Sequence, residues 1–133
     1  MTFLLDVSVL VSLSVFDHEF HGRATGWLKG LAKSGPAELA TCSITELGFV
    51  RVLAQAPQYG LTVTQARQQL MRIKANADVR FRFFADGNDT SKLPGWVRTP
   101  KQVTDGHLVQ LARTNGAKLA TFDRGIPEAV LVG

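Results

Sequence analysis

The sequence predicts an α/β fold with a central, mainly parallel β-sheet of four to five strands flanked by helices. Short apolar runs typical of buried strands recur along the chain, and segments with the apolar spacing of helices lie between them. No repeat, low-complexity tract or linker interrupts this alternation, so the 133 residues are expected to form one domain, residues 1–133.

The expected strands are short apolar runs. They are residues 3–5, 38–42, 79–84, 118–122 and 129–132. The run "VRFRFF" at 79–84 alternates apolar residues with Arg80 and Arg82, which predicts a strand with one basic face.

The expected helices are residues 8–16, 21–33, 43–55, about 64–77 and 104–114. Residues 21–33 place Ala24, Trp27, Leu28 and Leu31 on one face. The helix from Ser43 ends before Pro57, a residue that disfavours helix on its N-terminal side. The polar stretch 85–102 predicts a loop that could contain a short helix.

Composition limits the class of protein. One cysteine excludes an internal disulfide, and with only three histidines it argues against a closed zinc site. No stretch approaches the roughly 20 apolar residues that cross a membrane, and no secretory signal is visible, so a cytoplasmic protein is expected. The net charge of +4 permits, without requiring, a polyanionic partner.

Four acidic residues follow or face the ends of predicted strands. Asp6 ends the first strand, Glu46 lies just beyond the second, Asp105 opens a helix and Asp123 ends strand 118–122. Ligands of open α/β sheets bind beyond the carboxyl ends of the strands. Three of these acids also have local explanations: Ser43 with Glu46 as a capping box, Asp105 at a helix dipole and Asp123 in an Asx-turn. Asp6 is the hardest to explain locally, because a buried unpaired carboxylate is costly.

Taken together, the four acids predict a cation site. Carboxylates held close together repel one another, and a bound cation relieves that repulsion. Oxygen ligands without thiols favour Mg²⁺, with Mn²⁺ possible, and such an ion can activate water for hydrolysis.

The segments "LLDVSVLVSL", "TCSITELGFVRVL", "QVTDGHLVQLA" and "LATFD" resemble, in order and spacing, the PIN-domain family, specifically its VapC-type ribonuclease toxins. The resemblance implies a single PIN-like domain and Mg²⁺- or Mn²⁺-dependent hydrolysis of RNA by an endoribonuclease of a type II toxin–antitoxin module. It also implies homodimerisation and inhibition by a cognate antitoxin. Asp6, Glu46, Asp105 and Asp123 match the family's acidic positions, and so would be both catalytic and metal-binding.

Other residues are candidates for supporting roles. Ser8 stands where the family commonly has Asn and could donate a hydrogen bond to Asp6 or cap the helix. Thr104 matches a small hydroxyl residue before the third acid and could also cap its helix. Arg51 could pair with a carboxylate or contact phosphate. Gly106, after the third acid, lowers helix propensity and has no functional explanation in the sequence.

RNA contacts are expected mainly from basic and aromatic side chains. Arg80 and Arg82 suit the phosphate backbone, although a solvated strand face explains them equally well. Trp96, in the polar loop, could stack on a base or pack onto a partner.

Two other functions are compatible with the sequence. The first is a non-catalytic RNA-binding module with the same fold, whose acids would not converge. The second is a receiver- or phosphatase-like domain that uses Asp6 as a nucleophile. That chemistry needs a lysine beside the pocket, and Lys101 and Lys118 are the nearest candidates.

Overall fold

The computed structural model describes residues 1–133 and contains a five-stranded sheet in the order β3-β2-β1-β4-β5. The strands are β1 (Thr2–Leu5), β2 (Glu38–Cys42), β3 (Arg80–Phe84), β4 (Lys118–Thr121) and β5 (Val130–Leu131). Every neighbouring pair is parallel. The predicted α/β class is therefore confirmed, with all five strands present and the sheet wholly parallel.

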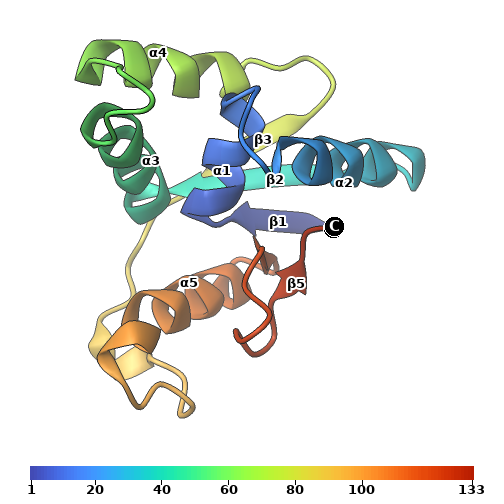
Figure 1. The fold of residues 1–133 in the computed structure, drawn as a ribbon. Helices are drawn as coiled ribbons and strands as arrows, with labels where there is room; N and C mark the ends of the chain where they lie inside the picture. The colour runs from blue at the N-terminus through green and yellow to red at the C-terminus, as the bar shows by residue number, and fades with distance from the viewer.

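Five α-helices flank this sheet: α1 (Val7–Ser14), α2 (His21–Lys33), α3 (Ser43–Gln55), α4 (Val63–Lys74) and α5 (Val103–Thr114). The loop between β3 and α5 contains two short 3-10 helices, η1 (Thr90–Lys92) and η2 (Pro100–Gln102). Figure 1 shows α1 to α4 on one side of the sheet and α5 on the other. None of the helices combines the length and the apolar character that a membrane span requires.

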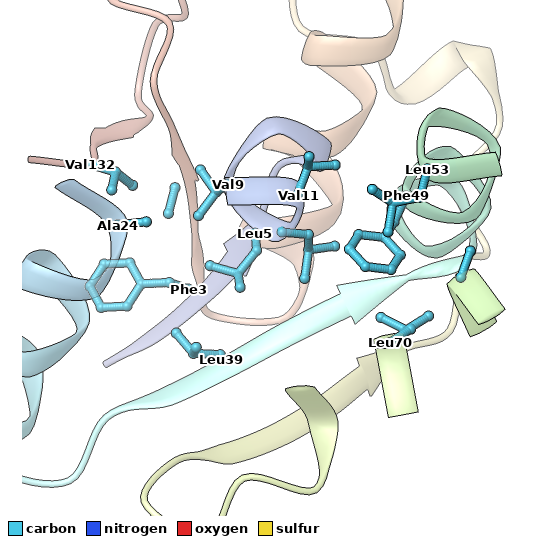
Figure 2. Close-up of a cluster of buried hydrophobic side chains, with 13 residues drawn as sticks. Phe3, Leu5, Val9, Val11, Ala24, Leu39, Phe49, Leu53, Leu70 and Val132 are labelled. Atoms are coloured by element: carbon cyan, nitrogen blue, oxygen red, sulfur yellow. The ribbon is translucent and has the colours of Figure 1, made fainter. Parts of the chain in front are cut away.

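Alternation along the strands divides the core into two layers. Phe3, Leu5 and Leu39 point toward the α1–α4 side and pack in one cluster with Phe49 and Leu53 of α3 (Figure 2). A second cluster fills the α5 side, where its members include Leu4, Ala40, Cys42, Phe84, Leu108, Leu111 and Leu119. Each fully buried Leu or Phe contributes about 1.5–3 kcal/mol to stability. The two layers together hold the sheet, and so the ends of its strands, in a defined position.

Two of the helix caps considered as local alternatives in the sequence do not form. The N-cap of α3 is Cys42, whose backbone N–H donates to the Thr45 hydroxyl at 3.0 Å, so no capping box joins Ser43 to Glu46. Helix α5 begins at Val103 after Gln102, because η2 runs directly into it, and Thr104 lies exposed inside the first turn. The carboxylate of Glu46 is therefore not used to cap its own helix.

Candidate active site

Asp6 lies at the carboxyl end of β1 and is held by both of its oxygens. Its Oδ1 accepts a hydrogen bond from the Val7 backbone N–H at 2.8 Å, which makes Asp6 the N-cap of α1. Its Oδ2 accepts from the Thr121 hydroxyl at 2.8 Å. Its own N–H donates to the Ala120 carbonyl at 3.0 Å. The orientation of Asp6 is thus set by hydrogen bonds between the end of β1 and the end of β4.

Asp123 joins Asp6 through the same threonine. The Asp123 N–H donates to the Thr121 hydroxyl oxygen at 3.1 Å, and the Asp123 carboxylate accepts from the Gly125 N–H at 2.7 Å. Thr121 is 1% exposed, so its hydroxyl is a buried link between the two aspartates. Sequence reasoning missed Thr121, because a threonine inside a strand is ordinary; its place two residues before Asp123 in "LATFD" was the available signal.

Asp105 reaches the same place from α5. Burial raises the pKa of the Asp105 carboxyl, and the negative charges of Asp6 and Asp123 raise it further. None of the three aspartates forms an ion pair with a lysine, arginine or histidine. The structure therefore brings Asp6, Asp105 and Asp123 together as three carboxylates without a protein cation.

The start of α5 is held closely against the preceding loop. A Cβ at Gly106 would lie 2.2 Å from Cγ2 of Val97 and 3.5 Å from Cδ of Pro94. Glycine permits this approach, which explains a residue that the sequence alone did not. His107 contacts Asp86 through its Nε2, a second tie between α5 and the loop.

Glu46 is placed differently from the three aspartates. Its Oε2 accepts hydrogen bonds from the Thr41 hydroxyl and from Lys74 Nζ, the latter at 2.7 Å. Alternate residues of a strand point to the same face of the sheet. Thr41 therefore points to the α1–α4 side, like Leu39. Thr121 points to the α5 side, like Leu119. Of the four acids expected to converge, Asp6, Asp105 and Asp123 lie near enough for their charges to interact, whereas Glu46 is paired with Lys74.

The aspartates suit a divalent cation in charge and in donor type. Their oxygens are the ligands that Mg²⁺ and Mn²⁺ prefer. They do not form a ready ligand set, because no three His, Cys, Asp or Glu side chains are placed so that they could hold a metal ion. An ion coordinated partly through water, as Mg²⁺ commonly is, needs fewer direct protein ligands.

The residues expected to support the acids take other places. Ser8 is exposed on α1 and makes no hydrogen bond to Asp6, because Val7 and Thr121 already supply the donors and Asp6 caps the helix itself. Thr104 is exposed and does not cap α5. Arg51 is exposed on α3 without an ion pair.

The residues expected to contact RNA lie away from the aspartates or are covered. Arg80 and Arg82 are on the edge strand β3 and approach Glu38 at 4.0 and 3.3 Å. Glu38 opens β2, so these pairs lie toward the end of the sheet opposite the acids. Trp96 packs against the core on the α5 side, and its indole N–H is buried without a partner. The Trp96 side chain is thus only partly exposed and packs mostly within the protein.

The structure does not favour a receiver-like nucleophile. Lys118 opens β4 in register with Phe3, near the amino ends of the strands, whereas Asp6 lies at the carboxyl ends. Lys101, in η2, is exposed and forms no ion pair. Neither lysine pairs with Asp6, as that chemistry would need.

A groove with a volume of about 1270 Å³ lies between α3 and α4. Glu46 lies among its lining residues, which include Leu47, Val50, Leu70 and Met71 together with the basic residues Arg51, Arg67 and Arg72. Leu47 and Met71 are each 67% exposed. The groove is thus an apolar surface with a basic rim, distinct from the cluster of aspartates.

Comparison with known proteins agrees with this fold. A family model described as PIN domain matches residues 3–130. Ribonuclease VapC38 of Mycobacterium tuberculosis is 37% identical over 130 residues, 92% of this chain and 86% of that protein. Ribonuclease VapC44 of the same species is 35% identical and covers 100% of this chain and 94% of its own length.

Two solved structures share the fold at 16% sequence identity. VapBC2 from Rickettsia felis, bound to a DNA fragment from its promoter, superposes with a TM-score of 0.64 over 98% of this chain and 97% of that chain. Mycobacterium tuberculosis VapC20, a sarcin–ricin loop cleaving toxin, gives 0.57 over 90% and 87%. The chain therefore belongs to the PIN-domain family and, within it, to the VapC ribonucleases.

Proposed function

We propose that this protein is a metal-dependent endoribonuclease and the toxin of a type II toxin–antitoxin module. The observation that carries the proposal is the meeting of Asp6, Asp105 and Asp123 beyond the sheet without a compensating protein cation. The relatives named ribonucleases, which match nearly the whole chain, support the same activity.

In this proposal Asp6, Asp105 and Asp123 would hold Mg²⁺ or Mn²⁺, directly or through water, while Glu46 stays paired with Lys74. When bound, the ion polarises the phosphate and lowers the pKa of the attacking water. The Thr121 hydroxyl donates to the Asp6 carboxylate and accepts from the Asp123 backbone N–H, so it fixes these two residues relative to each other. The net charge of +4 favours the approach of the RNA backbone without reading its sequence.

We also propose that a cognate antitoxin binds this protein and that the toxin is a homodimer. Exposed apolar side chains in the groove between α3 and α4 suit a protein partner, as such patches do on other soluble proteins. A structural relative is a VapBC2 complex on DNA, which agrees with a partner of the antitoxin type. An arginine of the antitoxin would find three carboxylates to pair with at the site.

The substitution Asp6→Asn tests the enzymatic proposal. Asparagine caps a helix about as well as aspartate, so α1 should keep its start while the site loses a charge. We expect the wild type to cleave total RNA with Mg²⁺ and to stop in EDTA, and Asp6→Asn to lose cleavage with an unchanged circular dichroism spectrum.

The exposed Asp17, whose side chain makes no hydrogen bond or ion pair, offers a matched control, and Asp17→Asn should cleave like the wild type. Full cleavage by Asp6→Asn would refute the assignment. A wild type that binds RNA but never cleaves it would favour the non-catalytic binding module instead.

A further inference from the structure

Arg23, in the first turn of α2, is an arginine that no carboxylate neutralises. Its guanidinium carbon lies 4.9 Å from the centroid of the Phe20 ring and 5.1 Å from that of the Phe122 ring. Its Nη2 donates a hydrogen bond to the Val132 carbonyl at 3.0 Å. Arg23 takes part in none of the five ion pairs of the protein. Because a guanidinium has five N–H donors, the partly exposed Arg23 keeps donors and a full charge for another anion.

A series of hydrogen bonds places Arg23 beside the aspartates. The Thr121 hydroxyl donates to the Asp6 carboxylate and accepts from the Asp123 N–H. The Thr121 carbonyl accepts from the Val132 N–H at 2.9 Å, and the Val132 carbonyl accepts from Arg23. Arg23 consequently lies at the carboxyl edge of the sheet, where β4 and β5 end, and two residues link it to both aspartates.

The packing around Arg23 holds the guanidinium in one position. The Phe122 ring lies 4.9 Å from the Phe20 ring, so the two rings form one aromatic surface beneath the charge. Ala24, the next residue of α2, is buried in the same cluster as Val132, and Figure 2 shows these two side chains close together. Two aromatic faces and a carbonyl thus orient the Arg23 side chain without neutralising it.

The other arginines do not combine these features. Arg80 and Arg82 form their ion pairs toward the opposite end of the sheet. Arg124 follows Asp123 but is exposed, and its side chain makes no hydrogen bond or ion pair that would fix its position. Arg23 is therefore the arginine that is both held at this edge and left without a counter-ion.

We propose that Arg23 binds a backbone phosphate of RNA at the edge of the candidate active site. The inference rests on the proposed function, because it takes RNA as the ligand. A guanidinium can bind phosphate through two parallel hydrogen bonds, which fix position as well as adding affinity. The charge is free for this role, since Asp17 and Glu19 of the preceding loop form no ion pair with it. The contact reads no sequence, needs no metal ion and sets where the strand lies.

Binding of a labelled single-stranded oligouridylate of about 12 nucleotides tests this, in EDTA so that no metal-dependent cleavage intervenes. Fluorescence anisotropy gives the Kd at several NaCl concentrations, and log Kd rises with log salt by about 0.7 for each phosphate contact with a single strand. Arg23→Gln keeps an N–H donor for the Val132 carbonyl but loses the charge. We expect its Kd to rise about fivefold and its salt slope to fall by about 0.7.

Three control variants separate the charge of Arg23 from its packing. Arg23→Lys keeps the charge and should keep the salt slope, with a Kd within about threefold of the wild type. Lys29→Gln removes an exposed, unpaired charge about 9 Å further along the same helix, and its Kd should change less than about twofold. Phe20→Leu loosens the packing against Arg23 without removing the charge, so its salt slope should equal that of the wild type.

The inference is overturned by an unchanged salt slope in Arg23→Gln, by an equal fall in Phe20→Leu, or by a wild type that does not bind the oligouridylate. Arg23→Met, which keeps an apolar stem beside the two rings, repeats the measurement should Arg23→Gln fold poorly. Failure of the proposed function is a separate result. A wild type that binds through Arg23 but never cleaves RNA with Mg²⁺ loses the enzymatic proposal alone, and one that cleaves while Arg23→Gln keeps its slope loses only the phosphate contact.

Discussion

Replacing Gly106 with alanine probes how closely α5 is packed beside the candidate active site. In a free helix interior this change stabilises by about 1 kcal/mol, because glycine is the poorer helix former. Here the new Cβ would lie 2.2 Å from Cγ2 of Val97, whereas ordinary contacts are 3.4 Å or longer. Valine is stiff about χ1, so the loop carrying Val97 must move with its side chain.

Overpacking of this kind costs about 1–3 kcal/mol, so the net expectation for Gly106→Ala is a loss of about 1 kcal/mol. In a chain of this length that lowers the melting temperature by about 4 °C. Thermal and urea unfolding, followed by circular dichroism, measure the change. Cleavage should fall as well, because the same shift moves Asp105.

Gly26 provides the matched control. It lies inside α2 and is exposed, and a Cβ added there would have no heavy atom within 4 Å, so Gly26→Ala should stabilise the protein by about 1 kcal/mol. Adding Val97→Ala to Gly106→Ala removes the overlapping methyl group and should recover part of the loss. If Gly106→Ala is as stable as Gly26→Ala, the close packing of α5 against the loop is not real.

Two further predictions concern the aspartates. Thr121→Val keeps the shape of the side chain but removes the donor to Asp6 and the acceptor for the Asp123 N–H. Because buried polar groups then lose their partner, the free energy of unfolding in urea should fall by about 1–3 kcal/mol. RNA cleavage should fall as well. Thr64→Val, on the exposed start of α4, should change stability by less than about 0.5 kcal/mol; an equal loss in both variants would contradict the role of Thr121. Asp105→Asn addresses the raised pKa of Asp105, whose first cause is burial and whose second is repulsion from Asp6 and Asp123. A raised carboxyl pKa destabilises the folded state at pH values above that pKa, and has no effect below the ordinary value of 3.8. At neutral pH, Asp105→Asn should therefore be more stable than the wild type, by about 0.5 kcal/mol after solvent screening. That gain should vanish in melts recorded below pH 3.8, and a variant no more stable than the wild type at neutral pH would remove the evidence for crowded charges.

The sequence by itself determined the order and type of the elements. Helical spacing and short apolar runs are local properties, so the bounds of α2, β2 and α3 agree with the pattern of residues 21–33, 38–42 and 43–55. It also placed Asp6 and Asp123 at strand ends, which a parallel sheet brings to one edge. Helix starts were less predictable, because Cys42 and Gln102 replaced the expected caps only when neighbouring segments were in place.

Only the tertiary structure decided which side of the sheet each acid faces and whether a basic side chain neutralises its charge. The Thr121 hydroxyl reaches Asp6 across 115 positions of the chain, and Lys74 reaches Glu46 across 28. Such contacts depend on strand register and on how helices pack over each face, which no local pattern encodes. Three aspartates consequently share one place beyond the sheet, while Glu46 is neutralised on the other side by a lysine that the order of residues did not indicate.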